Sequence, residues 1–120
     1  MGRNNQSGAW GEEYAAGYLR SRGYKILERN YRVRGGEIDI IAQKGGFLVF
    51  VEVKTRKSDA FGSAAEFVGP AKQRRLLLAA ECYLSGHPTE LQPRFDVIEL
   101  YAPEGTDTKK PELRHLENAF

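Results

Sequence analysis

The stretch from Phe47 to Lys54, FLVFVEVK, constrains the fold of this chain most strongly. Its uninterrupted apolar start is typical of a strand that is covered on both faces, as in the interior of a sheet. At its end, Glu52 and Lys54 place two charges on one face. Burying an unpaired charge carries a large desolvation cost. The strand must therefore leave the core at Glu52 or meet compensating groups there.

The length of 120 residues suits one domain with a real core and is too short for two domains of ordinary size. We expect a single domain over residues 1–120, with a mobile start at 1–7 and a C-terminal extension at 102–120. The net charge of +2 does not by itself predict nucleic-acid binding. Neither a secretory signal nor an apolar run long enough to span a bilayer is present. These features favour a cytoplasmic protein with no membrane partner.

Two stretches have helical periodicity. In the first, from Gly8 to Arg22, Glu12 shares the inward arc and Glu13 points outward. The apolar residues on that arc are Ala15, Ala16 and Leu19. The second runs from Pro70 to Gly86, and its predicted inward residues are Leu77, Ala80 and Leu84. Glycines at 23 and 86 suit the ends of these helices.

The strands are predicted at residues 24–31, 36–43, 47–54 and 94–100, with the basic stretch RVRGG as the first connecting loop. A strand that follows a helix usually returns parallel to its predecessor, so 94–100 should pair with 47–54. The segment LRHLENAF could add a short edge strand. Together these elements predict an α/β domain with a mixed central sheet, flanking helices and the core order αβββαβ.

The turn at Gly45-Gly46 decides what faces Glu52. A two-residue turn pairs Lys44 with Phe47 and places Asp39 directly across from Glu52, on the same face. A three-residue loop would instead set Asp39 against Val51 and on the other face.

In the first register, Asp39 and Glu52 would repel each other unless a cation lay between them. A hard divalent cation such as Mg²⁺ or Mn²⁺ suits oxygen ligands, here the two carboxylates and the Val53 carbonyl. Lys54 could position a water and stabilise charge on a phosphate. Glu12 could reach the cleft if the first helix packed on that face. In the simpler alternative, Lys54 only neutralises Glu52 and Asp39 caps a turn.

The motifs GEIDIIA, VFVEVKTR and RFDVIEL, with the preceding GEEYAAGYLRSRGYKILERNYR, resemble the bacterial YraN-like family. Its members are similar to archaeal Holliday junction resolvases and belong to the PD-(D/E)XK nuclease-like fold. The resemblance implies a restriction-endonuclease-like sheet and catalytic roles for four residues. Asp39 matches the motif Asp, Glu52 and Lys54 match the E-x-K pair, and Glu12 matches the first-helix acid of some resolvases. Ile38 stands where the motif has Pro.

Seven basic residues adjoin the proposed cleft and could contact phosphates. They are Arg32, Arg34, Arg56, Lys57, Lys72, Arg74 and Arg75. We therefore expect a metal-dependent endonuclease acting on DNA, branched or single-stranded, and by analogy with resolvases a homodimer. The alternative is a non-catalytic nucleic-acid-binding module on the same fold, or an interaction domain whose acids form only an ion network.

Four other polar residues are predicted to be structural. Cys82 has no cysteine partner and should be a buried thiol. Asp96 alternates with apolar residues on its strand; it either supports the site from behind the acids or pairs with Arg94, and the pairing is favoured. His87 and His115 have no nucleophile or ligand at useful spacing, so both are expected to be non-catalytic.

Overall fold

The computed structural model describes residues 6–57 and 68–120. The elements in these ranges, in chain order, are α1 (Gln6–Ser21), β1 (Lys25–Val33), β2 (Gly36–Lys44), β3 (Phe47–Arg56), α3 (Pro70–Gly86), β4 (Gln92–Tyr101), the 3-10 helix η1 (Gly105–Asp107) and β5 (Glu112–Leu116). The predicted mixed α/β class is confirmed. Of the predicted mobile start, residues 1–5 lie outside the described part, whereas Gln6 and Ser7 already belong to α1.

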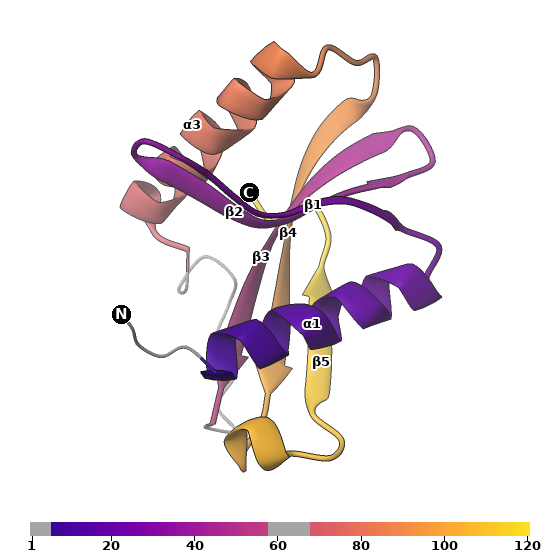
Figure 1. The fold of residues 1–120 in the computed structure, drawn as a ribbon, viewed down its shortest axis with the longest axis vertical. Helices are drawn as coiled ribbons and strands as arrows, with labels where there is room; N and C mark the ends of the chain where they lie inside the picture. Colours follow the sequence, from indigo (N-terminus) through magenta and orange to yellow (C-terminus); the bar gives the residue numbers. More distant parts are fainter. Residues whose placement is uncertain (1–5, 58–67) are drawn as a thin grey trace.

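The strands of the described residues form one sheet in the order β1-β2-β3-β4-β5 (Figure 1). Neighbouring strands are antiparallel except for β3 and β4, which are parallel as predicted. The predicted edge strand is β5, which pairs with β4. No helix in the described ranges is long and apolar enough to cross a membrane. In the order given above, β3 is the middle strand, as expected for a strand that is covered on both faces.

The β2–β3 hairpin has the predicted register. Lys44 pairs with Phe47 across Gly45-Gly46, and Gly45 adopts a φ of 57°. A positive φ at the first turn residue is typical of the primed turns that match strand twist. Regular pairing continues up to Ile40 and Val51. The two-residue turn is thus confirmed, and it brings Asp39 to the position beside Glu52.

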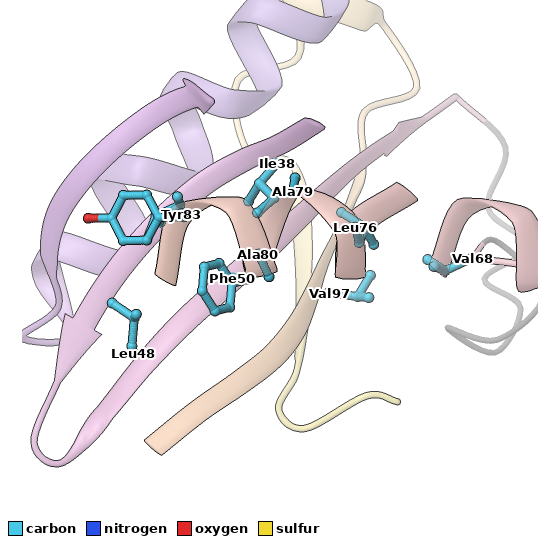
Figure 2. Packing of buried hydrophobic residues seen from close by; sticks show 10 residues of the cluster. Ile38, Leu48, Phe50, Val68, Leu76, Ala79, Ala80, Tyr83 and Val97 are labelled. Carbon is cyan, nitrogen blue, oxygen red and sulfur yellow. The ribbon is translucent and has the colours of Figure 1, made fainter. Parts of the chain in front are cut away.

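Two apolar clusters cover the two faces of β3. On one face, Val49 and Val51 pack with Ala15, Ala16 and Leu19 of α1. On the other face, Leu48 and Phe50 pack with α3 (Figure 2). The helices therefore lie on opposite sides of the sheet (Figure 1).

The inward face of α3 agrees with the prediction at Ala80 and Leu84 and differs from it at Leu77. Its buried residues are Leu76, Ala79, Ala80 and Tyr83. Leu77, predicted to face inward, is 45% exposed. The reason is a close approach to β2, where a Cβ on Gly36 would lie 2.5 Å from the carbonyl oxygen of Arg75. This contact fixes the rotation of the helix. The predicted burial of the Cys82 thiol is also wrong, because that residue is exposed.

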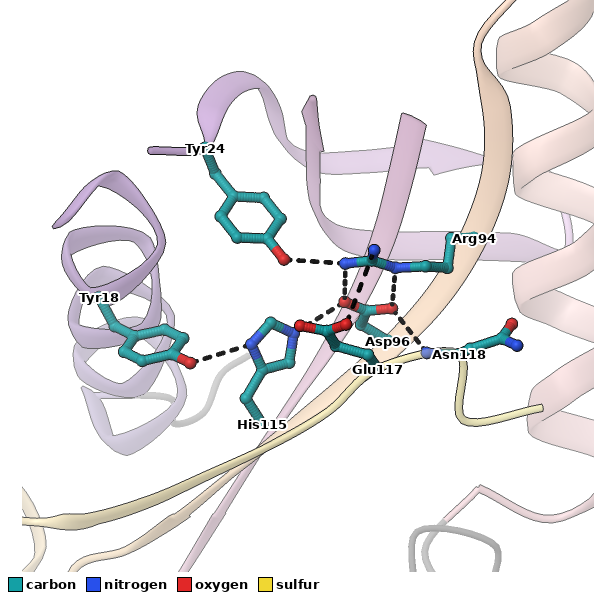
Figure 3. A network of polar contacts seen from close by, with 7 residues as sticks. All are labelled: Tyr18, Tyr24, Arg94, Asp96, His115, Glu117 and Asn118. Atoms are coloured by element: carbon teal, nitrogen blue, oxygen red, sulfur yellow. Dashed lines mark hydrogen bonds and ion pairs between the residues drawn. The ribbon is translucent and has the colours of Figure 1, made fainter. Parts of the chain in front are cut away.

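A buried ionic network fastens β5 and the C-terminal residues to the sheet (Figure 3). Asp96 is 1% exposed and accepts two hydrogen bonds of 2.9 Å from Arg94, as the predicted pairing requires. It also accepts from the backbone N–H of Asn118 at 3.0 Å and lies 2.7 Å from Nε2 of His115. The other ring nitrogen, Nδ1, lies 3.0 Å from the hydroxyl of Tyr18 on α1. His115 therefore joins α1 to β4, a contact that its sequence context gave no sign of.

Asp96→Asn should destabilise the protein at neutral pH by about 3 kcal/mol, because it removes the buried charge that balances half-buried Arg94. Burial alone would raise the pKa of Asp96, but hydrogen bonds from His115, Arg94 and Asn118 hold it below its usual value. This stabilisation is present above the unfolded pKa of about 3.9 and is lost as the pH falls through the folded value. Urea unfolding at pH 7 and pH 3 measures the effect. Asp107→Asn, at an exposed position, is the control; an equal loss at both pH values would contradict the assignment.

Leu76→Ala should destabilise the protein by about 2–5 kcal/mol, because it leaves a cavity between α3 and the sheet. The neighbouring Leu77→Ala should change stability by less than about 1 kcal/mol, since that side chain is 45% exposed. Chemical denaturation of both variants compares identical substitutions one residue apart. The reverse order would show that the helix packs with the face expected from its periodicity.

Candidate functional site

The site begins where β2 separates from β3. After the last regular pair, Ile40 and Val51, the carboxylate of Asp39 accepts a hydrogen bond of 2.8 Å from the backbone N–H of Val53. A side-chain oxygen thus takes the place of a backbone carbonyl. Because the N–H and C=O of one strand residue point toward the same neighbour, the Val53 carbonyl also faces the β2 side. Asp39 and Val53 therefore come together as the sequence predicted.

Glu52 is a buried carboxylate with only partial compensation. Its residue is 5% exposed, and Oε2 lies 3.2 Å from the ammonium of Lys72 on α3. The other oxygen, Oε1, is buried and has no hydrogen-bond partner. Burial, reinforced by the charge of Asp39, raises the pKa of Glu52 to about 7, against the opposing effect of Lys72. The site thus contains an acid that binds a proton near neutral pH.

Asp39 and Glu52 interact as a pair. Burial raises the pKa of Asp39, and the hydrogen bond from Val53 N–H partly offsets this. Because like charges at this spacing repel, the pair holds a proton more tightly than either acid would alone. The repulsion expected from their spacing is therefore relieved by protonation and by Lys72.

Glu12 approaches Asp39 from the opposite side of the sheet. The condition that α1 should pack on the face of Glu52 is not met, because α1 covers Val49 and Val51 instead. Even so, burial and then the charge of Asp39 raise the pKa of half-buried Glu12, so the two carboxylates interact. The predicted outward orientation of Glu13 is confirmed, since its side chain is 66% exposed and pairs with Arg29.

Lys54 lies two residues beyond Glu52 on the same strand and is half-buried. Its register partner on β4 is Glu99, which is fully buried and has one oxygen without a hydrogen-bond partner. The other oxygen of Glu99 lies 3.5 Å from Arg114. Sequence reasoning missed Glu99, although an acid within the apolar run of RFDVIEL was a usable signal. The charged end of β3 therefore adjoins a further buried acid.

The predicted basic residues do not form one cluster. Lys72 contacts Glu52, and Arg75 lies 3.6 Å from Glu37. Arg32 belongs to β1 and not to a loop, and it lines a groove together with Glu12.

The remaining four are Arg34, Arg56, Lys57 and Arg74. Arg34 and Arg74 are exposed. Arg56 ends β3, and the side chain of Lys57 lies beside Gly105. Three of the seven predicted residues therefore lie near the acids or the groove. Lys72 and Arg75 form ion pairs with acids, and Arg32 lines the groove.

The donor chemistry suits a hard divalent cation, since two carboxylates and a carbonyl face each other and one carboxylate oxygen is unpaired. In residues 6–57 and 68–120, however, no three His, Cys, Asp or Glu side chains gather as a metal-binding group. Glu12 lies across the sheet from Glu52, and Lys72 occupies one oxygen of Glu52. Any ion here would be held by Asp39, Glu52 and Val53 together with water.

The raised pKa of Glu52 predicts a pH-dependent stability of the metal-free protein. The folded protein retains a proton that the unfolded chain releases between about pH 4.3 and the folded pKa of about 7. Stability should therefore fall by about 1–3 kcal/mol as the pH rises through this window. Urea unfolding in chelator at pH 5 and pH 8 measures this fall. Glu52→Gln should flatten the profile and the control Glu13→Gln should not; parallel profiles for wild type and Glu52→Gln would contradict the assignment.

The sequence model of an uncharacterised protein family, UPF0102, matches residues 11–100 of this chain. Similar full-length relatives are UPF0102 proteins of Syntrophomonas wolfei subsp. wolfei, 47% identical over 98% of this chain and 99% of the relative, and of Syntrophotalea carbinolica, 49% identical over 94% and 89%. A third, from Flavobacterium psychrophilum, is 42% identical over 100% and 98%. The expected YraN-like membership is thereby confirmed, and the chain belongs to the UPF0102 family.

Proposed function

We propose that this protein is a divalent-metal-dependent endonuclease with a restriction-endonuclease-like, PD-(D/E)XK fold that cleaves DNA in the cytoplasm. The observation that carries the proposal is the buried pair of Asp39 and Glu52, with one unpaired carboxylate oxygen and Lys54 following on the same strand. Burying two carboxylates side by side is costly to folding, and a purely structural role would not require it.

In this proposal, Asp39, Glu52 and the Val53 carbonyl hold Mg²⁺ or Mn²⁺, with Glu12 supporting the site from α1. The ion, when bound, would polarise the phosphate and lower the pKa of a water. Lys54 orients the attacking water and stabilises charge that develops on the phosphate. Water adds its oxygen to phosphorus, the bond from phosphorus to one deoxyribose oxygen breaks, and one water proton ends on the released hydroxyl while the other leaves from the new phosphate to solvent. One strand end then carries phosphate and the other a hydroxyl group.

The DNA-binding surface would combine Arg32 and Lys72 near the acids with exposed Arg34 and Arg74. These side chains neutralise backbone phosphates, so affinity should fall as salt rises. A homodimer would place two such sites on a branched substrate with two strands to cut.

A second candidate is a non-catalytic nucleic-acid-binding module on the same fold. The ion pair of 3.2 Å between Lys72 and Glu52 favours it, because a protein cation already compensates the acid that a metal would bind. In this case the basic surface would bind nucleic acid and the acids would only stabilise the sheet.

Cleavage of linear, nicked, single-stranded and four-way DNA in Mg²⁺ or Mn²⁺ tests the proposal. We expect Asp39→Ala and Lys54→Ala each to lower the cleavage rate by at least about 100-fold, because each removes a group that acts on the reacting phosphate. Chelator should abolish cleavage. Lys109→Ala, an exposed lysine away from the site, is the control. Salt-sensitive binding without cleavage by the wild-type protein would support the second candidate and overturn the enzyme.

A further inference from the structure

Asn30 has an unusual backbone in the middle of β1. Its φ is 53°, in the left-handed region that residues other than Gly, Asn and Asp avoid. The β1–β2 pairing continues on both sides, with Arg29 opposite Ile40 and Tyr31 opposite Ile38. Asn30 therefore interrupts the ladder at the position across from Asp39. Such conformations persist where the surrounding structure requires them, and they cluster at functional sites.

The interruption changes the direction of β2 at Asp39. Ile40 packs in the cluster under α1, whereas Ile38 packs in the cluster under α3. In a regular strand these two residues would share a face. Asp39, between them, is thus flanked by an interruption of regular pairing on the β1 side and by the end of pairing on the β3 side. This bend leaves its carboxylate accessible to Glu52 on one side of the sheet and to Glu12 on the other.

The side chain of Asn30 joins the same arrangement. Burial and the charge of Asp39 raise the pKa of Glu12, and the neighbouring amide of Asn30 opposes both effects. Asn30 and Glu12 also line one groove of about 360 Å³, together with Arg32 and Glu37. An amide that donates to an acid orients the acid without adding charge.

We infer that Asn30 is a positioning residue that bends the sheet at Asp39 and holds Glu12 toward it, so that Glu12 supports from α1 the divalent cation that Asp39 binds. This inference rests on the proposed function and deepens it. The left-handed backbone provides the bend, and the amide provides the orientation. Asn30 itself touches neither the cation nor the phosphate.

The test separates the effect of the Asn30 amide side chain from the effect of its left-handed backbone. Asn30→Gly removes the amide while glycine adopts the same φ without strain. Asn118→Gly is a matched control, because Asn118 also has a φ of 53° and lies in the C-terminal network. Mn²⁺ binding by calorimetry and thermal unfolding are measured for both variants and the wild type. We expect Mn²⁺ affinity to fall about tenfold in Asn30→Gly and to stay unchanged in Asn118→Gly. High Mn²⁺ should restore cleavage by Asn30→Gly, which a merely structural defect would not allow.

Wild-type Mn²⁺ affinity retained by Asn30→Gly would overturn the inference and leave the proposed function intact. An Asn30→Gly variant without a cooperative unfolding transition would also overturn it, because the amide would then serve the scaffold. A wild-type protein that binds no Mn²⁺ would overturn the proposed metal site and the inference with it. The wild-type titration therefore distinguishes the two failures.

Discussion

The register between β2 and β3 is the constraint on which the rest of the structure depends. The two-residue turn at Gly45-Gly46 sets it, and a slip of one residue would turn Asp39 to the other face. The same slip would remove the hydrogen bond between Asp39 and Val53 N–H. It would also exchange the apolar sets that β3 presents to α1 and α3. Register, core and acid pair are thus specified together by one short turn.

The buried acids are compensated to different degrees. Asp96 is fully satisfied by Arg94, His115 and Asn118, and its pKa is lowered despite its burial. Glu52 has a single cation and an orphan oxygen, and its pKa is raised to about 7. A buried carboxylate with all its hydrogen bonds made stabilises a fold. One that lacks hydrogen bonds costs stability and can readily bind a different cation. This contrast separates the structural acid from the candidate functional one.

Local patterns predicted the parts of this protein that local rules control. The hairpin register followed from Gly45-Gly46, and the inward turn of Glu12 followed from helical periodicity. The rotation of α3 did not, because Leu76 and Leu77 are equally apolar and the choice depends on contact with Gly36.

Contacts between distant segments were also beyond sequence reasoning. His115 meets Tyr18 and Asp96 only after β5 has paired, and Lys72 meets Glu52 only through the packing of α3. The sequence pattern did not predict which side of the sheet α1 covers, because both faces of β3 are apolar. The position of Asn30 across from Asp39 could be predicted from the sequence, but its importance became visible only with the observed φ of Asn30.

The parallel pairing of β3 with β4 has a consequence for the order of folding. The strands β1, β2 and β3 are joined by short turns and can pair through local contacts, which form fast. Pairing of β4 must wait until the long crossover through α3 closes, and the loop entropy of that step is large. The hydrogen bond of Asp39 to Val53 belongs to the early hairpins, whereas Lys72 arrives with the late helix. We therefore expect the two carboxylates to come together in a nascent sheet, still open to water, before the lysine that later neutralises one of them.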